Sequence, residues 1–162
     1  MTMKRNDVLA LLDGEGIPYE LAEHPAVYTI GEMETLGLPF QKQVAKNLFL
    51  RDDKKRNYWL LTLREEKRAD LKALRQTLES RPLTFASEAD LRALLGLEKG
   101  SVTPFGLLND TDHRVRLLLD GAFRGGSIAV HPNENTATVY LRTADLENLL
   151  RRRGVSVGYL DL

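Results

Sequence analysis

The chain has 162 residues, of which 43% are hydrophobic and 28% charged, the balance of an ordinary soluble globular protein. It contains no cysteine, which excludes disulfides, thiolate metal sites, cysteine nucleophiles and iron–sulfur clusters. The 23 basic and 23 acidic side chains cancel, which over the whole chain argues against indiscriminate binding to nucleic acid. This length is typical of one domain, so we expect residues 1–162 to form a single domain.

The neutral total is a sum of unequal segments. Residues 1–40 carry 2 basic and 7 acidic side chains, residues 41–81 carry 12 and 6, and residues 82–162 carry 9 and 10. The middle segment therefore has a surplus of 6 positive charges. No apolar stretch approaches the length of a membrane-spanning helix and no leader segment is recognisable, so we expect a cytoplasmic protein without a membrane partner.

The first half of the chain alternates helical and strand patterns. Apolar positions recur at helical spacing near the start, and short apolar runs bounded by Gly, Pro and charged residues follow. The predicted elements are a helix over 4–15, a strand over 17–21, a helix over 29–36, a strand over 47–51, a charged turn over 52–57, its hairpin partner over 58–63 and a helix over 70–78.

The second half is richer in strands. Its β-branched and apolar runs predict most of them, and a hydroxyl residue precedes each helical pattern. The predicted elements are a short strand over 83–86, a helix over 87–95, strands over 115–120, 127–130 and 136–141, a helix over 143–153 and an edge strand over 155–160. Strands with interspersed helices predict one α/β or α+β domain.

Three segments are suited to chemistry. Lys46 and Asn47 place an ammonium and a carboxamide at the start of a strand, where they can meet phosphates or carbonyls. Glycines, a proline and hydroxyls crowd the loop 96–106, whose backbone N–H groups can approach a ligand closely. His131 leaves a strand for a turn, and histidine is a frequent acid–base group near neutral pH. Each segment also has a non-functional interpretation: the lysine is solvated, the loop is an ordinary connection, and the histidine is structural.

Other chemistries find little support. The GK[ST] and GxGxxG spacings of phosphate and dinucleotide loops are absent. No GxSxG motif marks a serine hydrolase, and three scattered histidines without cysteine make a zinc site improbable. We therefore expect neither a metal nor an organic cofactor.

The ordered set of these segments resembles the YbaK/prolyl-tRNA-synthetase-associated domain family of bacterial trans-editing deacylases, and within it the free-standing Ala-tRNA(Pro) deacylases. The resemblance covers essentially the whole chain. It is carried by residues 23–29, 46–50, 58–60, 70–72, 83–87, 100–105, 109–110, 131–132, 135–138 and 160–162. The family fold that it implies is a compact domain with a bent, mostly antiparallel sheet surrounded by helices.

The resemblance also implies a site. The family's lysine and asparagine match Lys46 and Asn47, its GxxxP loop matches residues 100–104, and its histidine matches His131. Family members more often carry His-Thr before the lysine, so Val44 and Ala45 are expected to alter the pocket rim. The residues expected in catalysis are Lys46, Asn47, Gly100 and Ser101. Those expected to bind substrate and form the pocket wall are Val102, Thr103, Pro104 and His131.

The activity implied by the resemblance is hydrolysis of the ester in mischarged Ala-tRNA(Pro), with no metal and no covalent intermediate. We expect a monomer that contacts the acceptor end of tRNA(Pro), with prolyl-tRNA synthetase as a transient partner. Relatives differ mainly in the pocket, so Cys-, Ser- or Thr-charged tRNA stays open as the substrate. A non-catalytic module that binds tRNA or a synthetase, and a small-molecule-binding domain, are the alternatives from other classes.

Overall fold

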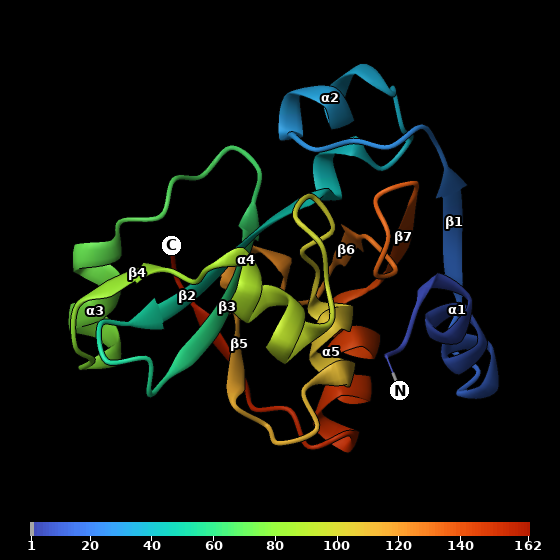
Figure 1. Ribbon diagram of the computed structural model, residues 1–162. Coiled ribbons are helices and arrows are strands. Elements are labelled where there is room, and N and C mark those ends of the chain that lie inside the picture. Colours follow the sequence, from blue (N-terminus) through green and yellow to red (C-terminus); the bar gives the residue numbers. More distant parts are fainter. Residues whose placement is uncertain (1) are drawn as a thin grey trace.

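The strands of the protein form two sheets (Figure 1). The computed structural model describes residues 2–162. The smaller sheet is antiparallel, in the order β1-β7-β6, and consists of β1 (Tyr19–Glu23), β6 (Ser127–Val130) and β7 (Ala137–Arg142). The larger sheet has the order β4-β2-β3-β5-β8 and consists of β2 (Ala45–Asp52), β3 (Tyr58–Arg64), β4 (Leu83–Phe85), β5 (Val115–Asp120) and β8 (Val157–Leu160). In it β4, β2 and β3 are antiparallel neighbours, whereas β5 is parallel to both β3 and β8.

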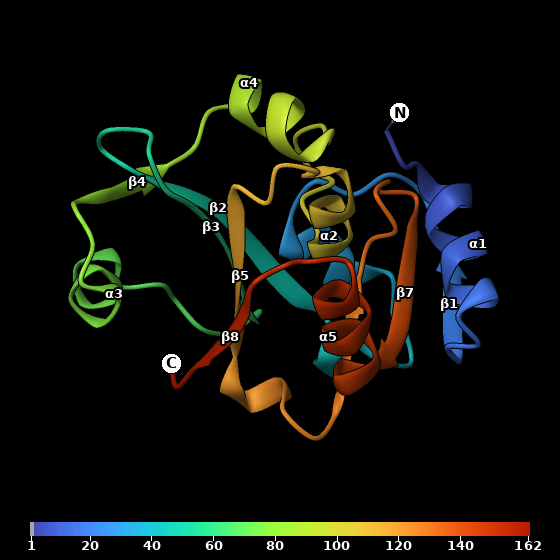
Figure 2. The ribbon, with the colours of Figure 1, turned by 90° about the horizontal axis from the view of Figure 1, so that it is seen from below.

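Helices lie around and between the sheets. They are α1 (Arg5–Gly14), α2 (Ile30–Thr35), α3 (Leu71–Leu78), α4 (Glu88–Asp90), which a π-helical turn continues (Leu91–Leu95), and α5 (Thr143–Arg152). Helix α5 contacts β6, β7 and β8, and it lies between the two sheets in Figure 2. Its Leu146, Leu149 and Leu150 are fully buried, so α5 supplies much of the core that the sheets share. No helix within residues 2–162 has the length and apolar character needed to cross a membrane.

Strand β3 is central in the larger sheet and is apolar on both faces. Tyr58 and Leu60 belong to the main core, whereas Trp59 and Leu61 belong to a second cluster that includes Leu74 of α3. A strand that is covered on both faces has a continuous apolar run instead of an alternating pattern. The aromatic and leucine-rich run at 58–63 therefore follows from its central place.

The β2–β3 hairpin is closed by a buried carboxylate. Asp52 is 1% exposed and accepts hydrogen bonds from the N–H groups of Lys54 at 3.0 Å and Arg56 at 2.9 Å. It also accepts from the backbone and side-chain N–H groups of Asn57, at 3.1 and 2.9 Å. Burial opposes ionisation, but these hydrogen bonds prevail and hold the pKa of the Asp52 carboxyl below its usual range. The turn fixes the strand register that sets Lys46 at the other end of β2.

The predicted helices and strands are confirmed, with small shifts at their ends, and so is the mixed α/β class. Two features go beyond the prediction. The bent sheet that the resemblance implied is built as two sheets, which a parallel bridge between Val44 and Ala129 joins. Part of the predicted loop 96–106 is a 3-10 turn (Pro104–Asn109), because the Thr103 hydroxyl accepts a hydrogen bond from the Phe105 N–H and the Phe105 ring is fully buried.

Candidate active site

A cavity of about 210 Å³ opens beside the start of β2. The bridge between Val44 and Ala129 brings the two sheets together there, and both residues line the cavity. Pockets for drug-sized ligands measure about 300–1,000 Å³, so this cavity is suited to a smaller group.

One part of the lining is apolar. Val27, Met33, Val44 and Ala129 are each at most 4% exposed and form one hydrophobic cluster with the buried Phe40. They come from the segment before α2, from α2, from the residue before β2 and from β6. This convergence of four segments makes a wall suited to a small apolar side chain.

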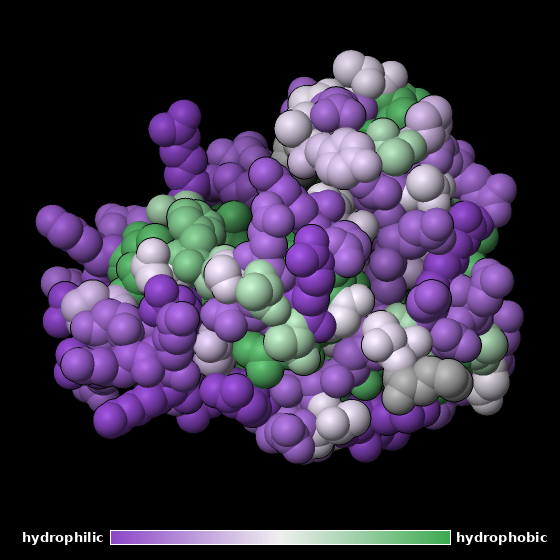
Figure 3. All heavy atoms as spheres, in the orientation of Figure 1, coloured by the Kyte–Doolittle hydropathy of each residue, from purple (hydrophilic) through white to green (hydrophobic). Residues whose placement is uncertain are grey.

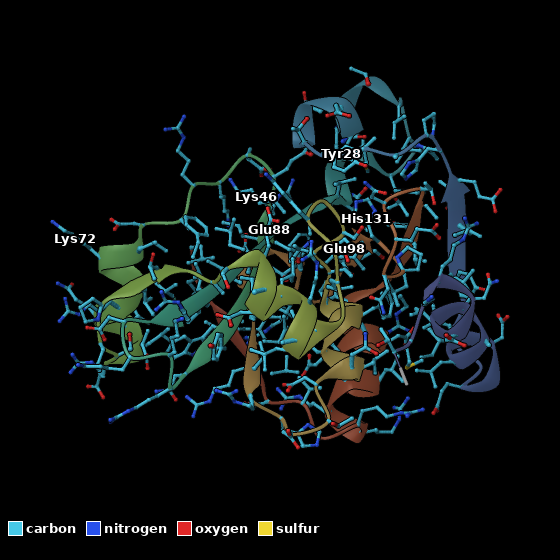
Figure 4. All side chains as sticks on the ribbon, in the orientation of Figure 1. Tyr28, Lys46, Lys72, Glu88, Glu98 and His131 are labelled. Carbon is cyan, nitrogen blue, oxygen red and sulfur yellow. The ribbon has the colours of Figure 1, made fainter. Side chains whose placement is uncertain are left out.

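Lys46 and Asn47 supply the polar part from β2. The Thr62 hydroxyl, on the strand opposite, donates to Asn47 Oδ1 at 2.6 Å and fixes the orientation of the amide. Within residues 2–162 the Asn47 Nδ2 group donates no hydrogen bond, and the Lys46 ammonium has no ion pair. Both groups therefore remain available to a ligand. Figure 4 shows Lys46, Tyr28 and His131 arriving from three separate parts of the chain.

The predicted loop approaches the cavity through Gly100 and Val102. Gly100 has a φ of +89°, and a Cβ atom there would lie 2.6 Å from the Tyr28 ring, so only glycine fits. The Ser101 N–H is engaged with the Glu98 carbonyl at 3.0 Å. The N–H groups of Gly100 and Val102 have no acceptor in the part of the chain that the structure describes. Both of these loop residues, which line the cavity, therefore have an N–H group free to meet a carbonyl oxygen.

Three predicted residues lie beside the cavity and do not line it. Ser101 is 7% exposed and borders a neighbouring groove, and Pro104 is buried at the start of the 3-10 turn. The fully buried Thr103 donates its hydroxyl to the His131 carbonyl at 2.6 Å. Thr103 thus ties the loop to the strand end that carries His131. The direct roles expected of these three residues stay predictions.

His131 lines the cavity as a neutral imidazole. Its Nδ1–H donates to the Ala137 carbonyl at 2.8 Å, which leaves Nε2 as the acceptor nitrogen. Burial lowers the pKa of His131, and the neighbouring His24 adds to this, against the opposing effect of the Ala137 hydrogen bond. The His24 Nε2 accepts from the Thr138 hydroxyl at 2.8 Å, and the two imidazole centroids are 6.1 Å apart. His24 therefore orients Thr138, which also lines the cavity.

Several residues that line the cavity were not predicted from the sequence. Tyr28 and Thr138 lie in segments 23–29 and 135–138, which carry the resemblance. The resemblance is therefore the sequence feature that could have predicted them. Val27 shares the first of these segments, but Met33 and Ala129 have no distinguishing motif and are placed by topology alone. Val44 and Ala45, expected at the pocket rim, are part of the lining.

The arrangement suits stabilisation of negative charge on a carbonyl oxygen. An ammonium, an amide donor and free backbone N–H groups surround a small apolar pocket, and such preorganised donors stabilise an oxyanion strongly. Within residues 2–162, no three His, Asp or Glu side chains are grouped so as to hold a metal ion.

Comparison with known proteins identifies the family. Residues 24–149 match the model of the aminoacyl-tRNA editing domain. Prolyl-tRNA editing protein ProX of Acetoanaerobium sticklandii is 43% identical over 156 residues, which cover 96% of this chain and 95% of that protein. Prolyl-tRNA synthetase associated domain-containing protein 1 of Bos taurus is 36% identical over 140 residues, covering 83% of this chain and 81% of the relative.

A solved structure supports the same fold. The crystal structure of a protein provisionally assigned as a trans-editing enzyme for prolyl tRNA synthetase has a TM-score of 0.72 and 22% identity, over 100% of this chain and 99% of that one. Together with the family model, which spans most of the chain, these matches confirm the resemblance drawn from the motifs. The chain belongs to the aminoacyl-tRNA editing domain family.

Proposed function

We propose that the protein hydrolyses the ester between tRNA(Pro) and a wrongly attached amino acid, and that alanine is the preferred amino acid. The observation that carries the proposal is the cavity of about 210 Å³ in which Lys46, Asn47 and the neutral His131 meet. The names of the relatives, a prolyl-tRNA editing protein and a prolyl-tRNA synthetase associated protein, support tRNA(Pro) as the substrate. The small apolar wall supports alanine.

In the proposed reaction a water molecule attacks the ester carbonyl. The tetrahedral intermediate places negative charge on the carbonyl oxygen, which accepts hydrogen bonds from the Gly100 and Val102 N–H groups. The C–O bond to the ribose then breaks, and the ribose oxygen takes up the proton that the attacking water has released, which leaves the free amino acid and the ribose hydroxyl as products. Because an aminoacyl ester is already activated, holding the ester, the water and the neighbouring ribose hydroxyl together supplies most of the acceleration.

The side chains from β2 complete the proposed site. The Lys46 ammonium adds positive charge near the carbonyl or holds the terminal phosphate, and the Asn47 amide fixes the ester by hydrogen bonding. His131, with Nε2 as its free acceptor, forms one wall of the pocket. In this proposal no residue of the protein forms a covalent bond to the substrate.

An editing site separate from the synthetase site can reject proline by its size. A synthetase site built for proline rejects the smaller alanine only by lost apolar contact, which supplies about 1–3 kcal/mol. We expect the wall formed by Met33, Val44 and Ala129 to accept a methyl group and to exclude the pyrrolidine ring of proline. Correctly charged Pro-tRNA(Pro) therefore escapes hydrolysis.

A deacylation panel tests the proposed function directly. We expect rapid hydrolysis of Ala-tRNA(Pro), slower hydrolysis of Ser-, Cys- and Thr-charged tRNA, and none of Pro-tRNA(Pro). A faster reaction with Cys-, Ser- or Thr-tRNA would reassign the preferred amino acid. Tight tRNA binding with no turnover of any charged tRNA would favour a non-catalytic module.

The pocket wall is tested with His131→Ala. Removing the imidazole enlarges the cavity, so we expect the ratio of alanine to larger amino acids in the same panel to fall about tenfold. His113→Ala is the matched control, because His113 is exposed and does not line the cavity. Unchanged selectivity in a folded His131→Ala protein would remove His131 from the wall.

A further inference from the structure

A second groove, of about 340 Å³, lies next to the active-site cavity. Asn47 and Val102 line both spaces, so the two are neighbours. The groove lies between β2 and the start of α4, and most of its walls are apolar, including Leu48, Phe49 and Phe85. The proposed reaction does not use it.

Phe85, on the edge strand β4, is the unusual side chain of this groove. It is 57% exposed, whereas the other four phenylalanines are at most 6% exposed. Figure 3 shows a group of hydrophobic side chains on this face, over β4 and beside α3. An exposed aromatic ring beside a candidate binding cavity supplies a flat apolar surface on which a ligand can pack.

We infer that this groove holds the base of the nucleotide that precedes the terminal adenosine of the RNA substrate, stacked on the Phe85 ring. The inference rests on the proposed function, which places the ester of the terminal adenosine at the adjoining cavity. Aromatic rings bind the bases of unpaired RNA with little regard to sequence, because every base has a π-face. The two charged side chains that line the groove, Lys99 and Glu88, balance each other, and Lys46 of the same strand β2 supplies a cation at the adjoining cavity.

A groove on the other side of Tyr28 offers the competing exit for the RNA. It is lined by three cationic and three anionic side chains: Lys4, Arg5, Lys99, Asp7, Glu98 and Glu134. Arg5 is already paired with Glu23 and lies 4.0 Å from Glu134. The exposed Tyr28 lines this groove, and the charges of its lining balance, as do those of the Phe85 groove. The Phe85 groove differs in its mostly apolar walls, which suit the face of a base better than the polar lining of the competing groove.

Substrates of two lengths test the inference. We expect Phe85→Ala to lower kcat/KM about tenfold for an alanylated CCA trinucleotide, through KM, and to leave hydrolysis of alanyl-adenosine unchanged. Phe85→Trp retains a stacking surface and is expected to keep wild-type activity on both. Leu21→Ala is the control, since Leu21 is another exposed large apolar side chain, on the smaller sheet.

A binding measurement keeps this test separate from the proposed function. An uncharged CCA trinucleotide with 2-aminopurine in place of its second nucleotide should lose fluorescence on binding to the wild type and not to Phe85→Ala. If the wild type fails to deacylate any substrate, the proposed function fails, and this quenching still decides the inference. The inference would be overturned if Phe85→Ala lowered kcat/KM equally for the trinucleotide and for alanyl-adenosine, or lowered it for neither. It would also be overturned if the decrease appeared only in the presence of prolyl-tRNA synthetase.

Two glutamates distinguish the grooves. Glu88 lines the Phe85 groove, 3.9 Å from Lys99, and Glu98 lines the competing groove, 3.0 Å from Arg92 (Figure 4). Removing a carboxylate beside bound RNA relieves repulsion with its phosphates. We expect Glu88→Gln to bind the CCA trinucleotide about twofold more tightly and Glu98→Gln to bind it as the wild type does. The reverse order would place the RNA in the other groove.

Discussion

The strength of Lys46 as a functional group comes from its surroundings. A surface ammonium is hydrated and contributes little to a bound carbonyl, whereas the same charge in a partly enclosed cavity acts through a lower dielectric constant. Lys46 is only partly exposed, and no carboxylate of residues 2–162 neutralises it. The neutral His131 across the cavity does not oppose its charge. The charge of the lysine is therefore available to a ligand in the cavity.

Lys46→Ala should lower the deacylation of Ala-tRNA(Pro) at least tenfold, because it removes this cation and leaves the backbone donors in place. Single-turnover kinetics on Ala-tRNA(Pro) measures the loss. Lys42→Ala is the control, since the exposed Lys42 lies four residues earlier and does not line the cavity. A Lys46→Ala protein that folds by circular dichroism and deacylates as fast as the wild type would exclude the role.

At the scale of elements, the β2–β3 hairpin depends on the Asp52 carboxylate. Asp52→Ala removes four hydrogen bonds from a charged acceptor, and we expect it to lower the free energy of unfolding by about 2–3 kcal/mol. Urea denaturation measures the change. The neighbouring Asp53→Ala should have a smaller effect, because Asp53 pairs with Arg81 at the surface.

The pH dependence of this effect has a definite sign. The folded-state pKa of Asp52 is lowered, so its contribution is complete above the unfolded pKa of about 3.9 and is lost as pH falls through the folded value. The stability difference between wild type and Asp52→Ala should therefore shrink in acid. A difference that grows below pH 4 would contradict the proposed role of the carboxylate.

The elements were predictable where local pattern decides the structure. The run at 58–63 indicated a strand, and Gly96 and Gly154 marked helix ends by adopting positive φ. The cavity wall was not predictable in this way. Met33 and Ala129 meet only because α2 folds over the contact between the two sheets, and an apolar pattern tells which face of an element is buried but not which neighbour covers it. Lys46 and His131 were singled out by their chemistry, but only the resemblance placed them in one site, because their spacing along the chain carries no geometry.

At the scale of the whole molecule, the net charge of zero is the sum of segments with opposite charge. The segment with a surplus of 6 positive charges includes β2, and the acidic segment includes α1, β1 and those residues within 27–33 that also line the cavity. The proposed function therefore calls for local contact with RNA, since a net charge of zero supplies no overall field to hold a long duplex.

Salt dependence measures how many phosphates the protein contacts. Each contact with single-stranded RNA contributes about 0.7 to the slope of log K against log salt. Because the proposed contact covers only the end of the acceptor strand, we expect a slope of a few units at most, measured by tRNA binding from low to moderate salt. The steep slope of a broad duplex binder would contradict a local contact.

The pairing of β1 with β7 has a consequence for the newly made chain. Residues 19–23 can pair only with residues 137–142, which are translated after more than a hundred intervening residues. At ordinary rates of synthesis this delay is on the order of ten seconds, during which β1 has no partner on the ribosome. Glu20 and Glu23 place negative charge on this strand, and charged side chains discourage unpaired edges from joining other chains. The cavity, which needs Thr138, forms only after residue 138 has been translated.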